Sequence, residues 1–165
     1  MRPLSEKEIR RSFVNSSRSE GMAMTLPPGL ADVPWDEREF LGWRDPRAPL
    51  RGYAVLWRDD RPLGIALRAA DSRMSDRTAA MCLICESAQS GADVSLFTAK
   101  RAGAAGRNGN TVGQYICADL GCSRRVRTEI PPWLRTHDPG EVIHERAAAL
   151  RSRLDGFADH VLGAA

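Results

Sequence analysis

Four cysteines, arranged as two close pairs, constrain the fold of this chain more than any other feature. Cys82 and Cys85 have two residues between them, and Cys117 and Cys122 have four. Cysteines held in a tight turn can point both sulfurs inward, and two such pairs complete a tetrahedral site with Zn–S bonds of about 2.3 Å. The spacing therefore predicts one structural zinc ion with Cys82, Cys85, Cys117 and Cys122 as its ligands.

Two other interpretations of the cysteines stay open. A thioredoxin-like redox pair would need the first pair to open a helix after a strand in a βαβ pattern, which the sequence lacks. Four buried free thiols would leave the paired spacing unexplained. Because four thiolate ligands leave no open coordination position, the predicted zinc is structural. Binding of this kind contributes on the order of 10–16 kcal/mol, so this half of the chain is expected to need the metal to fold.

The chain between and after the cysteine pairs predicts a hairpin followed by a helix. Residues 93–99 and 111–117 alternate in polarity as strands do, and the glycine-rich residues 100–110 between them predict a mobile, cationic tip. The second pair is expected where the second strand turns into a short helix at 122–127, whose amides would stabilise anionic sulfurs. A cysteine knuckle, a hairpin and a helix-start pair is the order of a treble-clef zinc finger, placed at about residues 80–130.

The N-terminal half predicts one helix and then β structure. Ser5 and Glu8 form a capping box, and Leu4 and Ile9 form the matching hydrophobic staple. Prolines rule out long regular elements in the segment that follows. The expected elements, in order, are a helix over 6–15, a break at 16–21, irregular chain over 22–50 with a short strand at 40–43, a hairpin of strands 52–58 and 63–68, and a linker over 69–78.

A long helix is predicted at the C-terminal end, at about residues 139–162. Asp138 is a suitable N-cap, followed by proline at the first helical position. Apolar residues then recur at spacings of four and three, namely Ile143, Ala147, Leu150, Leu154, Phe157 and Val161. The predicted fold class is α+β: a single domain over residues 1–165 with an N-terminal helix, antiparallel β-hairpins, a treble-clef zinc finger and a long C-terminal helix.

Charge is informative only locally. The formal net charge of +3 falls to about +1 once four thiolates and one Zn²⁺ are counted. Residues 96–135 nevertheless carry seven basic and two acidic side chains. This stretch is either a solvated face or a cationic surface for RNA phosphates or an acidic protein. The candidate contact residues are Leu83 at the knuckle, which could equally pack under the hairpin, and Lys100, Arg101, Arg107 and Tyr115 of the hairpin.

Several classes of function are not expected. The sequence has no apolar run long enough to span a membrane and no secretory signal, so we expect a cytoplasmic protein. It shows no phosphate-binding loop and no catalytic arrangement, so we expect neither an enzyme nor a small-molecule substrate. His137, His144 and His160 are expected on the surface; His137 could be a ligand only if one cysteine were not.

The cysteine segments resemble a known family. The runs Cys-Leu-Ile-Cys at 82–85, Val-Ser-Leu-Phe at 94–97 and Gly-Asn-Thr-Val-Gly-Gln-Tyr-Ile-Cys-Ala-Asp-Leu-Gly-Cys-Ser at 109–123 are similar to the treble-clef zinc-finger domain of elongation-factor-G-binding proteins, the FBP domain. Upstream runs at 12–15, 40–46 and 64–68 extend the resemblance over nearly the whole chain.

The resemblance implies a binding protein whose zinc ligands are the four cysteines. Fusidic-acid-resistance members of this family bind elongation factor G, mainly through this domain, and promote its release from stalled ribosomes. Those members carry an N-terminal helical bundle before the domain, whereas one helix is predicted here. The leading hypothesis is thus a zinc-dependent adaptor for elongation factor G. The alternatives are an RNA- or ribosome-binding finger that uses the basic hairpin tip and, third, a thiol redox protein.

Overall fold

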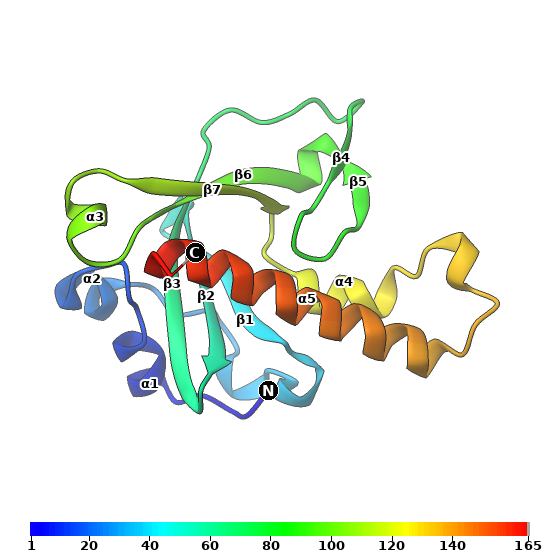
Figure 1. Cartoon of the computed structure of the whole chain (residues 1–165), viewed down its shortest axis with the longest axis horizontal. Coiled ribbons are helices and arrows are strands. Elements are labelled where there is room, and N and C mark those ends of the chain that lie inside the picture. Colours follow the sequence, from blue (N-terminus) through cyan, green and yellow to red (C-terminus); the bar gives the residue numbers. More distant parts are fainter. Residues whose placement is uncertain (165) are drawn as a thin grey trace.

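The computed structural model describes residues 1–164 and is built around a five-stranded antiparallel sheet (Figure 1). The strand order is β1-β2-β3-β6-β7, and β4 and β5 form a separate two-stranded sheet. The strands are β1 (Phe40–Asp45), β2 (Ala48–Arg58), β3 (Arg61–Ala69), β4 (Ala79–Met81), β5 (Ala88–Ser90), β6 (Val94–Lys100) and β7 (Thr111–Cys117).

Five α-helices accompany the strands in residues 1–164. They are α1 (Glu6–Arg11), α2 (Arg18–Ala23), α3 (Gly103–Arg107), α4 (Cys122–Thr128) and α5 (Pro139–Leu162). Short 3-10 turns lie at Leu30–Asp32, Trp35–Glu37, Gly91–Asp93 and Pro132–Leu134. The predicted α+β class, with antiparallel hairpins and a long C-terminal helix, is confirmed.

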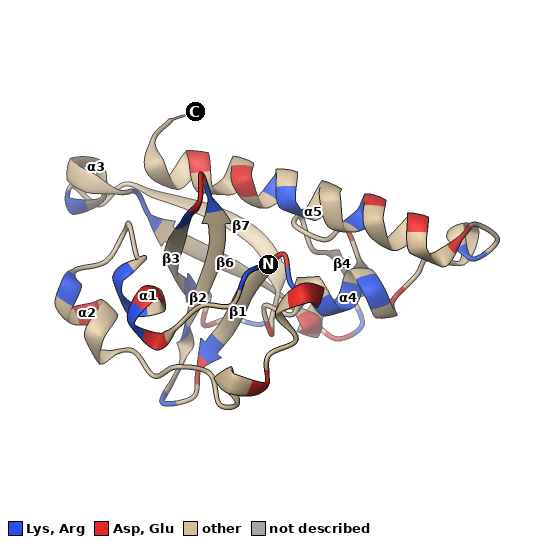
Figure 2. Cartoon of the chain, turned by 90° about the horizontal axis from the view of Figure 1, so that it is seen from below, with Lys and Arg blue, Asp and Glu red and all other residues tan. Residues whose placement is uncertain are grey.

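Both faces of the sheet are covered. Figure 2 shows α5 on one side of the sheet and α1 and α2 on the other. In β2, the consecutive residues 53–56 are therefore all buried: Ala54 and Leu56 join the cluster under α5, while Tyr53 and Val55 join the cluster under the N-terminal segment. A strand buried on both faces reads as a continuous apolar run, as this one does.

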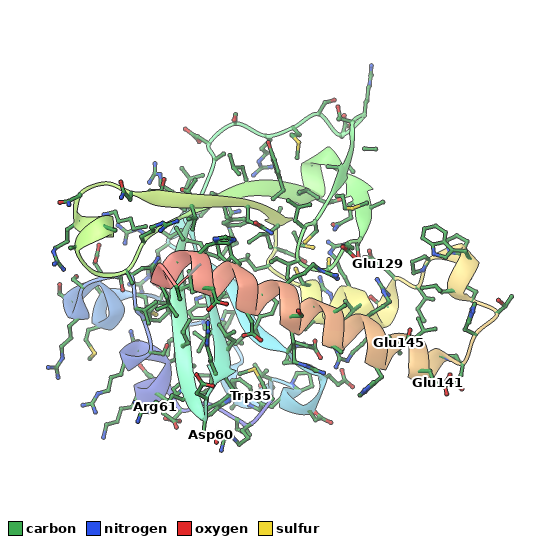
Figure 3. The ribbon with its side chains drawn as sticks, viewed as in Figure 1. Trp35, Asp60, Arg61, Glu129, Glu141 and Glu145 are labelled. Carbon is green, nitrogen blue, oxygen red and sulfur yellow. The ribbon has the colours of Figure 1, made fainter. Side chains whose placement is uncertain are left out.

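The predicted hairpin of strands 52–58 and 63–68 is present, but its loop is shorter than the four residues 59–62 that the prediction left between the strands: only Asp59 and Asp60 lie in it. Arg58 pairs with Arg61, and both intervening residues have positive φ angles, 46° and 60°. Two successive positive φ angles mark the type I′ turn, whose twist matches that of the flanking strands, and aspartate tolerates this region better than most residues. Asp60 and Arg61 lie at the hairpin tip (Figure 3).

The N-terminal prediction is partly wrong. The Ser5–Glu8 capping box is present, and Leu4 and Ile9 are buried in one cluster, but α1 ends at Arg11 instead of reaching residue 15. The segment expected only to break the helix contains the start of α2, which has its own capping box between Ser17 and Glu20. The same four-residue signal was present in the sequence at both sites. Between the two helices, residues 12–15 leave helical geometry to run along β3.

Asn15 bridges β3 and β6 where these two strands diverge. β3 and β6 pair only at Arg68–Thr98 and Ala69–Phe97. Beyond these pairs, the Asn15 side chain accepts a hydrogen bond from the Ala66 amide (2.8 Å) and donates to the Ala66 carbonyl (2.9 Å) and the Lys100 carbonyl (3.0 Å). One side-chain amide thus satisfies backbone groups of both strands, which would otherwise lie unpaired where the strands diverge.

The long helix begins where its cap predicts. Asp138 accepts a hydrogen bond from the Glu141 amide, and α5 ends at Gly163, whose φ of 77° is favourable for glycine. The buried stripe follows the prediction from Ala147 onward, but at its start Val142 is buried in place of Ile143. Acidic residues lie toward both ends of α5, and basic residues lie between them (Figure 2). Among the helices of residues 1–164, none combines the length and apolar composition that a membrane span requires.

The hairpin tip is more ordered than its composition predicts. Gly103–Arg107 forms the short helix α3, and the Ala102 amide donates to the carbonyl of Val161 in α5 (2.7 Å). A Cβ at Gly106 would lie 1.7 Å from the Arg101 carbonyl oxygen, so the turn can close only around glycine. The short helix α3 was not among the predicted elements, because these glycines permit close backbone packing within the tip.

We predict that Asn15→Asp destabilises the fold. A carboxylate keeps the acceptor for the Ala66 amide but cannot donate to the two carbonyls, which it would instead repel. The expected loss in the free energy of unfolding is about 1–3 kcal/mol, measured by urea denaturation. Asn108→Asp, at an exposed position that ends α3, is the matched control and should change little. Equal effects of the two substitutions would contradict the proposed role of Asn15.

Candidate metal centre

The four predicted ligands converge. The sulfurs of Cys82, Cys85, Cys117 and Cys122 all lie within 4.8 Å of one another, and all four residues are buried. The Cys82–Cys122 sulfurs are 3.6 Å apart and the Cys85–Cys117 sulfurs 3.5 Å. Four sulfurs around a zinc ion at about 2.3 Å would be separated by about 3.8 Å, so the cluster has the dimensions of a tetrahedral site.

The first cysteine pair sits in a tight knuckle between β4 and β5. The Glu86 amide donates to the Cys82 carbonyl (2.8 Å), and Glu86 takes a positive φ of 53° that turns the chain back into β5. The Cys85 amide points at the Cys82 sulfur, 3.5 Å away. Backbone amides directed at a sulfur stabilise its anionic form, which is the form that binds metal.

The second pair joins the end of β7 to α4. Cys117 is the last residue of β7 and Cys122 the first of α4, as predicted. Between them Leu120 takes a positive φ of 56°, and its amide donates to the Cys117 carbonyl (2.8 Å). Its side chain and carbonyl lie against Gly42 and Gly52 of the sheet, where a Cβ at Gly42 would come within 2.5 Å of the Leu120 oxygen. These glycines let the finger contact the sheet closely.

Two polar residues support the sulfurs and were not identified from the sequence. The Gln89 side-chain amide donates to the Cys117 sulfur (3.3 Å), and the buried Ser87 hydroxyl lies 3.4 Å from the Cys85 sulfur. Hydrogen bonds to ligand sulfurs orient them and tune the metal site. In the sequence, only the closeness of Ser87 and Gln89 to Cys85 pointed to them. That closeness does not distinguish them from the other polar residues of the small hairpin.

The electrostatics of the cluster fit a dication. Hydrogen bonding with Cys117 lowers the pKa of the Cys85 thiol, while the neighbouring sulfurs and burial raise the pKa of Cys122 well above its usual value. Like charges this close in a buried site cannot all be present without compensation. A zinc ion supplies that compensation and four bonds that hold two distant segments together. The donor set fits one structural zinc, because four cysteine ligands leave no coordination position open.

The cationic stretch predicted for residues 96–135 is partly neutralised by ion pairs. Arg124 pairs with Asp119 (2.6 Å), Arg125 with Glu129 (2.6 Å), and Arg127 forms two hydrogen bonds with Glu39 at 2.8 and 2.9 Å. Glu39 lies far away in the sequence, so counting charges within the stretch missed its effect. Within residues 1–164, the basic residues of this stretch left without an ion pair are Lys100, Arg101, Arg107 and Arg135.

The candidate contact residues fall into two groups. Leu83 and Tyr115 are neighbours, because the Leu83 amide donates to the Tyr115 carbonyl (2.8 Å), and their exposed fractions are 43% and 42%. Leu83 thus faces solvent and does not pack under the hairpin. Lys100, Arg101 and Arg107 lie at the opposite end of the β6–β7 hairpin and do not adjoin this pair. All three histidines are exposed and stand outside the sulfur cluster.

We predict one zinc ion per chain, lost in the Cys82→Ser/Cys85→Ser double variant. Removing two thiolates leaves too few ligands, and the finger should unfold with the metal. Metal analysis by mass spectrometry and circular dichroism measure the two effects. Leu83→Ala, between the same cysteines, is the matched control and should retain the zinc. A double variant that keeps one zinc per chain would show that these cysteines are not the ligands.

We predict that Glu39→Gln destabilises the domain by about 3 kcal/mol, because it leaves the Arg127 guanidinium without its charge partner in a largely buried place. Glu39 is buried and also donates its backbone amide to the Ser123 hydroxyl, so β1 and α4 meet here. Glu37→Gln, two residues earlier and exposed, is the control for thermal and urea denaturation. A loss of stability no greater than that of the control would refute the role of this pair.

Comparison with known proteins identifies the family. The sequence matches the family described as FBP C-terminal treble-clef zinc-finger over residues 8–161. No curated protein gives a significant match. Among solved structures, that of the fusidic acid resistance protein FusC is similar, with 24% identity, a TM-score of 0.47, and coverage of 62% of this chain and 45% of that chain. This chain thus spans less than half of the FusC chain. Its match over residues 8–161 shows that the chain belongs to the FBP C-terminal treble-clef zinc-finger family.

Proposed function

We propose that this protein is a non-enzymatic, zinc-dependent adaptor that binds elongation factor G. The observation that carries the proposal is the exposed pair Leu83 and Tyr115, which we call the knuckle patch. Membership of the FBP family supports the choice of partner, since the resemblance implies that the zinc finger makes the main contact with the factor.

The knuckle patch has the features of a small binding anchor. Tyrosine is enriched among residues that dominate binding energy, and an exposed apolar side chain beside it supplies area that a partner can cover. The exposed residues Thr111 and Gly113 continue the same face of β7 from Tyr115. A partner could therefore extend its contact along the strand from the knuckle.

In this proposal the metal acts as a scaffold. Leu83 lies between Cys82 and Cys85, so the zinc that fixes these cysteines also fixes how Leu83 is presented. A preformed contact surface loses less conformational entropy on binding. The adaptor would promote release of the factor from stalled ribosomes by binding more tightly to the conformation of the factor that has left the ribosome.

One observation favours the RNA-binding alternative. Lys100 and Arg107 are exposed and Arg101 is half-buried, and none of the three has an ion-pair partner within residues 1–164. Three cations at a hairpin tip could contact phosphates. The ion pairs of Arg124, Arg125 and Arg127 reduce the wider basic surface that such an interface would use, so we rank this function second.

We predict that zinc-loaded protein binds purified elongation factor G and that Leu83→Ala and Tyr115→Ala each weaken binding about tenfold, the effect of losing about 1.4 kcal/mol at a contact of this kind. Isothermal titration calorimetry measures the affinity. Met22→Ala is the control because Met22 is also an exposed apolar residue, but it lies in α2.

Zinc content and thermal stability of both variants should remain those of the original protein, so that weaker binding reports contact and not unfolding. Unchanged affinity in both variants would place the contact elsewhere. No binding to the factor, together with RNA binding that falls steeply with salt and is weakened by Arg107→Ala, would favour the alternative.

A further inference from the structure

A cavity of about 290 Å³ lies between the N-terminal segment and the sheet face that carries β2, β3 and β6. Its size is close to the lower end of the range for small-molecule sites. Its lining includes Asn15 and Ser16 of the N-terminal segment and Lys100 and Thr111 of the β6–β7 hairpin. The cavity shares no lining residue with the knuckle patch or with the zinc ligands.

Two arginines on neighbouring strands line this cavity. Arg51 of β2 is directly opposite Arg68 of β3, and both line the cavity. Like charges in directly opposed cross-strand positions destabilise a sheet. Neither arginine forms an ion pair within residues 1–164. The strand register therefore places two cationic side chains at this cavity in directly opposed positions.

The remaining charges leave the cavity positive. Lys100 adds a third cation, and Glu20 is the single carboxylate of the lining. The Ser17 amide donates to Glu20 (2.7 Å), which lowers the pKa of this carboxyl, and Lys100 and Arg51 act in the same direction. The lining consequently carries three positive charges and one negative charge. A net charge of about +2 matches a phosphate monoester, which carries about −1.5 to −2 near neutral pH.

Uncharged residues add a second kind of contact. The Ser16 hydroxyl oxygen is buried and has no hydrogen-bond partner in residues 1–164, so it is free to bond a ligand. Met24, Tyr53 and Ala66 contribute apolar and aromatic lining to the same cavity. A charged group beside apolar and aromatic surface is suited to a ligand with an anionic head and an apolar body.

We propose that this cavity binds a small organic phosphate monoester, with Arg51, Arg68 and Lys100 contacting the phosphate and the apolar lining contacting its organic part. Guanidinium groups recognise phosphate oxygens through paired hydrogen bonds, and Arg51 and Arg68 offer two such groups from directly opposed strand positions. The inference does not depend on elongation factor G, because the cavity and the knuckle patch have no residue in common.

The test uses the zinc-loaded full chain and three probes: phenyl phosphate, inorganic phosphate and phenol. Amide chemical shifts in two-dimensional NMR spectra locate and quantify binding. We expect phenyl phosphate to give saturable shifts at residues around the cavity, inorganic phosphate to bind the same residues more weakly, and phenol to give no saturable shifts. Equal affinity for phenyl phosphate and inorganic phosphate would overturn the organic part of the proposal.

Arg51→Met and Arg68→Met should each weaken phenyl phosphate binding at least tenfold, and Lys100→Met should do the same if either arginine variant fails to fold. Arg77→Met, at an exposed position outside the cavity, is the matched control and should bind like the original chain. Each arginine variant should also resist urea at least as well as the original, since it relieves the repulsion between the pair. Absence of saturable shifts, or an equal loss in the control, would overturn the proposal.

Discussion

The buried cluster of four sulfurs is the constraint on which the second half of the molecule depends. Like charges 3.5–3.6 Å apart are not stable together without a cation. Zinc therefore fixes the knuckle, the end of β7 and the first turn of α4 relative to one another. Helix α5 is added to this unit through two arginines, because Arg153 donates to the Ile84 carbonyl and Arg146 to the Val126 carbonyl.

The finger is coupled to the sheet by two kinds of contact that act together. Leu120 packs where Gly42 and Gly52 leave room, and Arg127 forms its ion pair with the buried Glu39. The first contact is apolar and depends on shape, and the second depends on charge. Both link residues more than sixty positions apart, so the sheet and the finger are one structural unit instead of two that happen to adjoin.

Local signals in the sequence were sufficient for the caps, the turn at Asp59 and the cysteine ligands, since each rests on residues within a few positions of one another. The second capping box, at Ser17, is as readable from the sequence as the first. Other features could not be found locally. The Glu39–Arg127 pair and the role of Asn15 depend on strands that meet only in the folded chain, and the opposition of Arg51 to Arg68 depends on strand register.

The sparse pairing of β3 with β6 gives the sheet a seam. Only two residue pairs cross it, whereas the β2–β3 and β6–β7 hairpins are fully laddered on either side. Asn15 closes the seam from 51 and 85 positions away in the chain, so its hydrogen bonds need the N-terminal segment, β3 and β6 to be brought together. The seam is thus the line along which this sheet has the fewest backbone pairs, and one side-chain amide from the N-terminal segment supplies part of what those pairs lack.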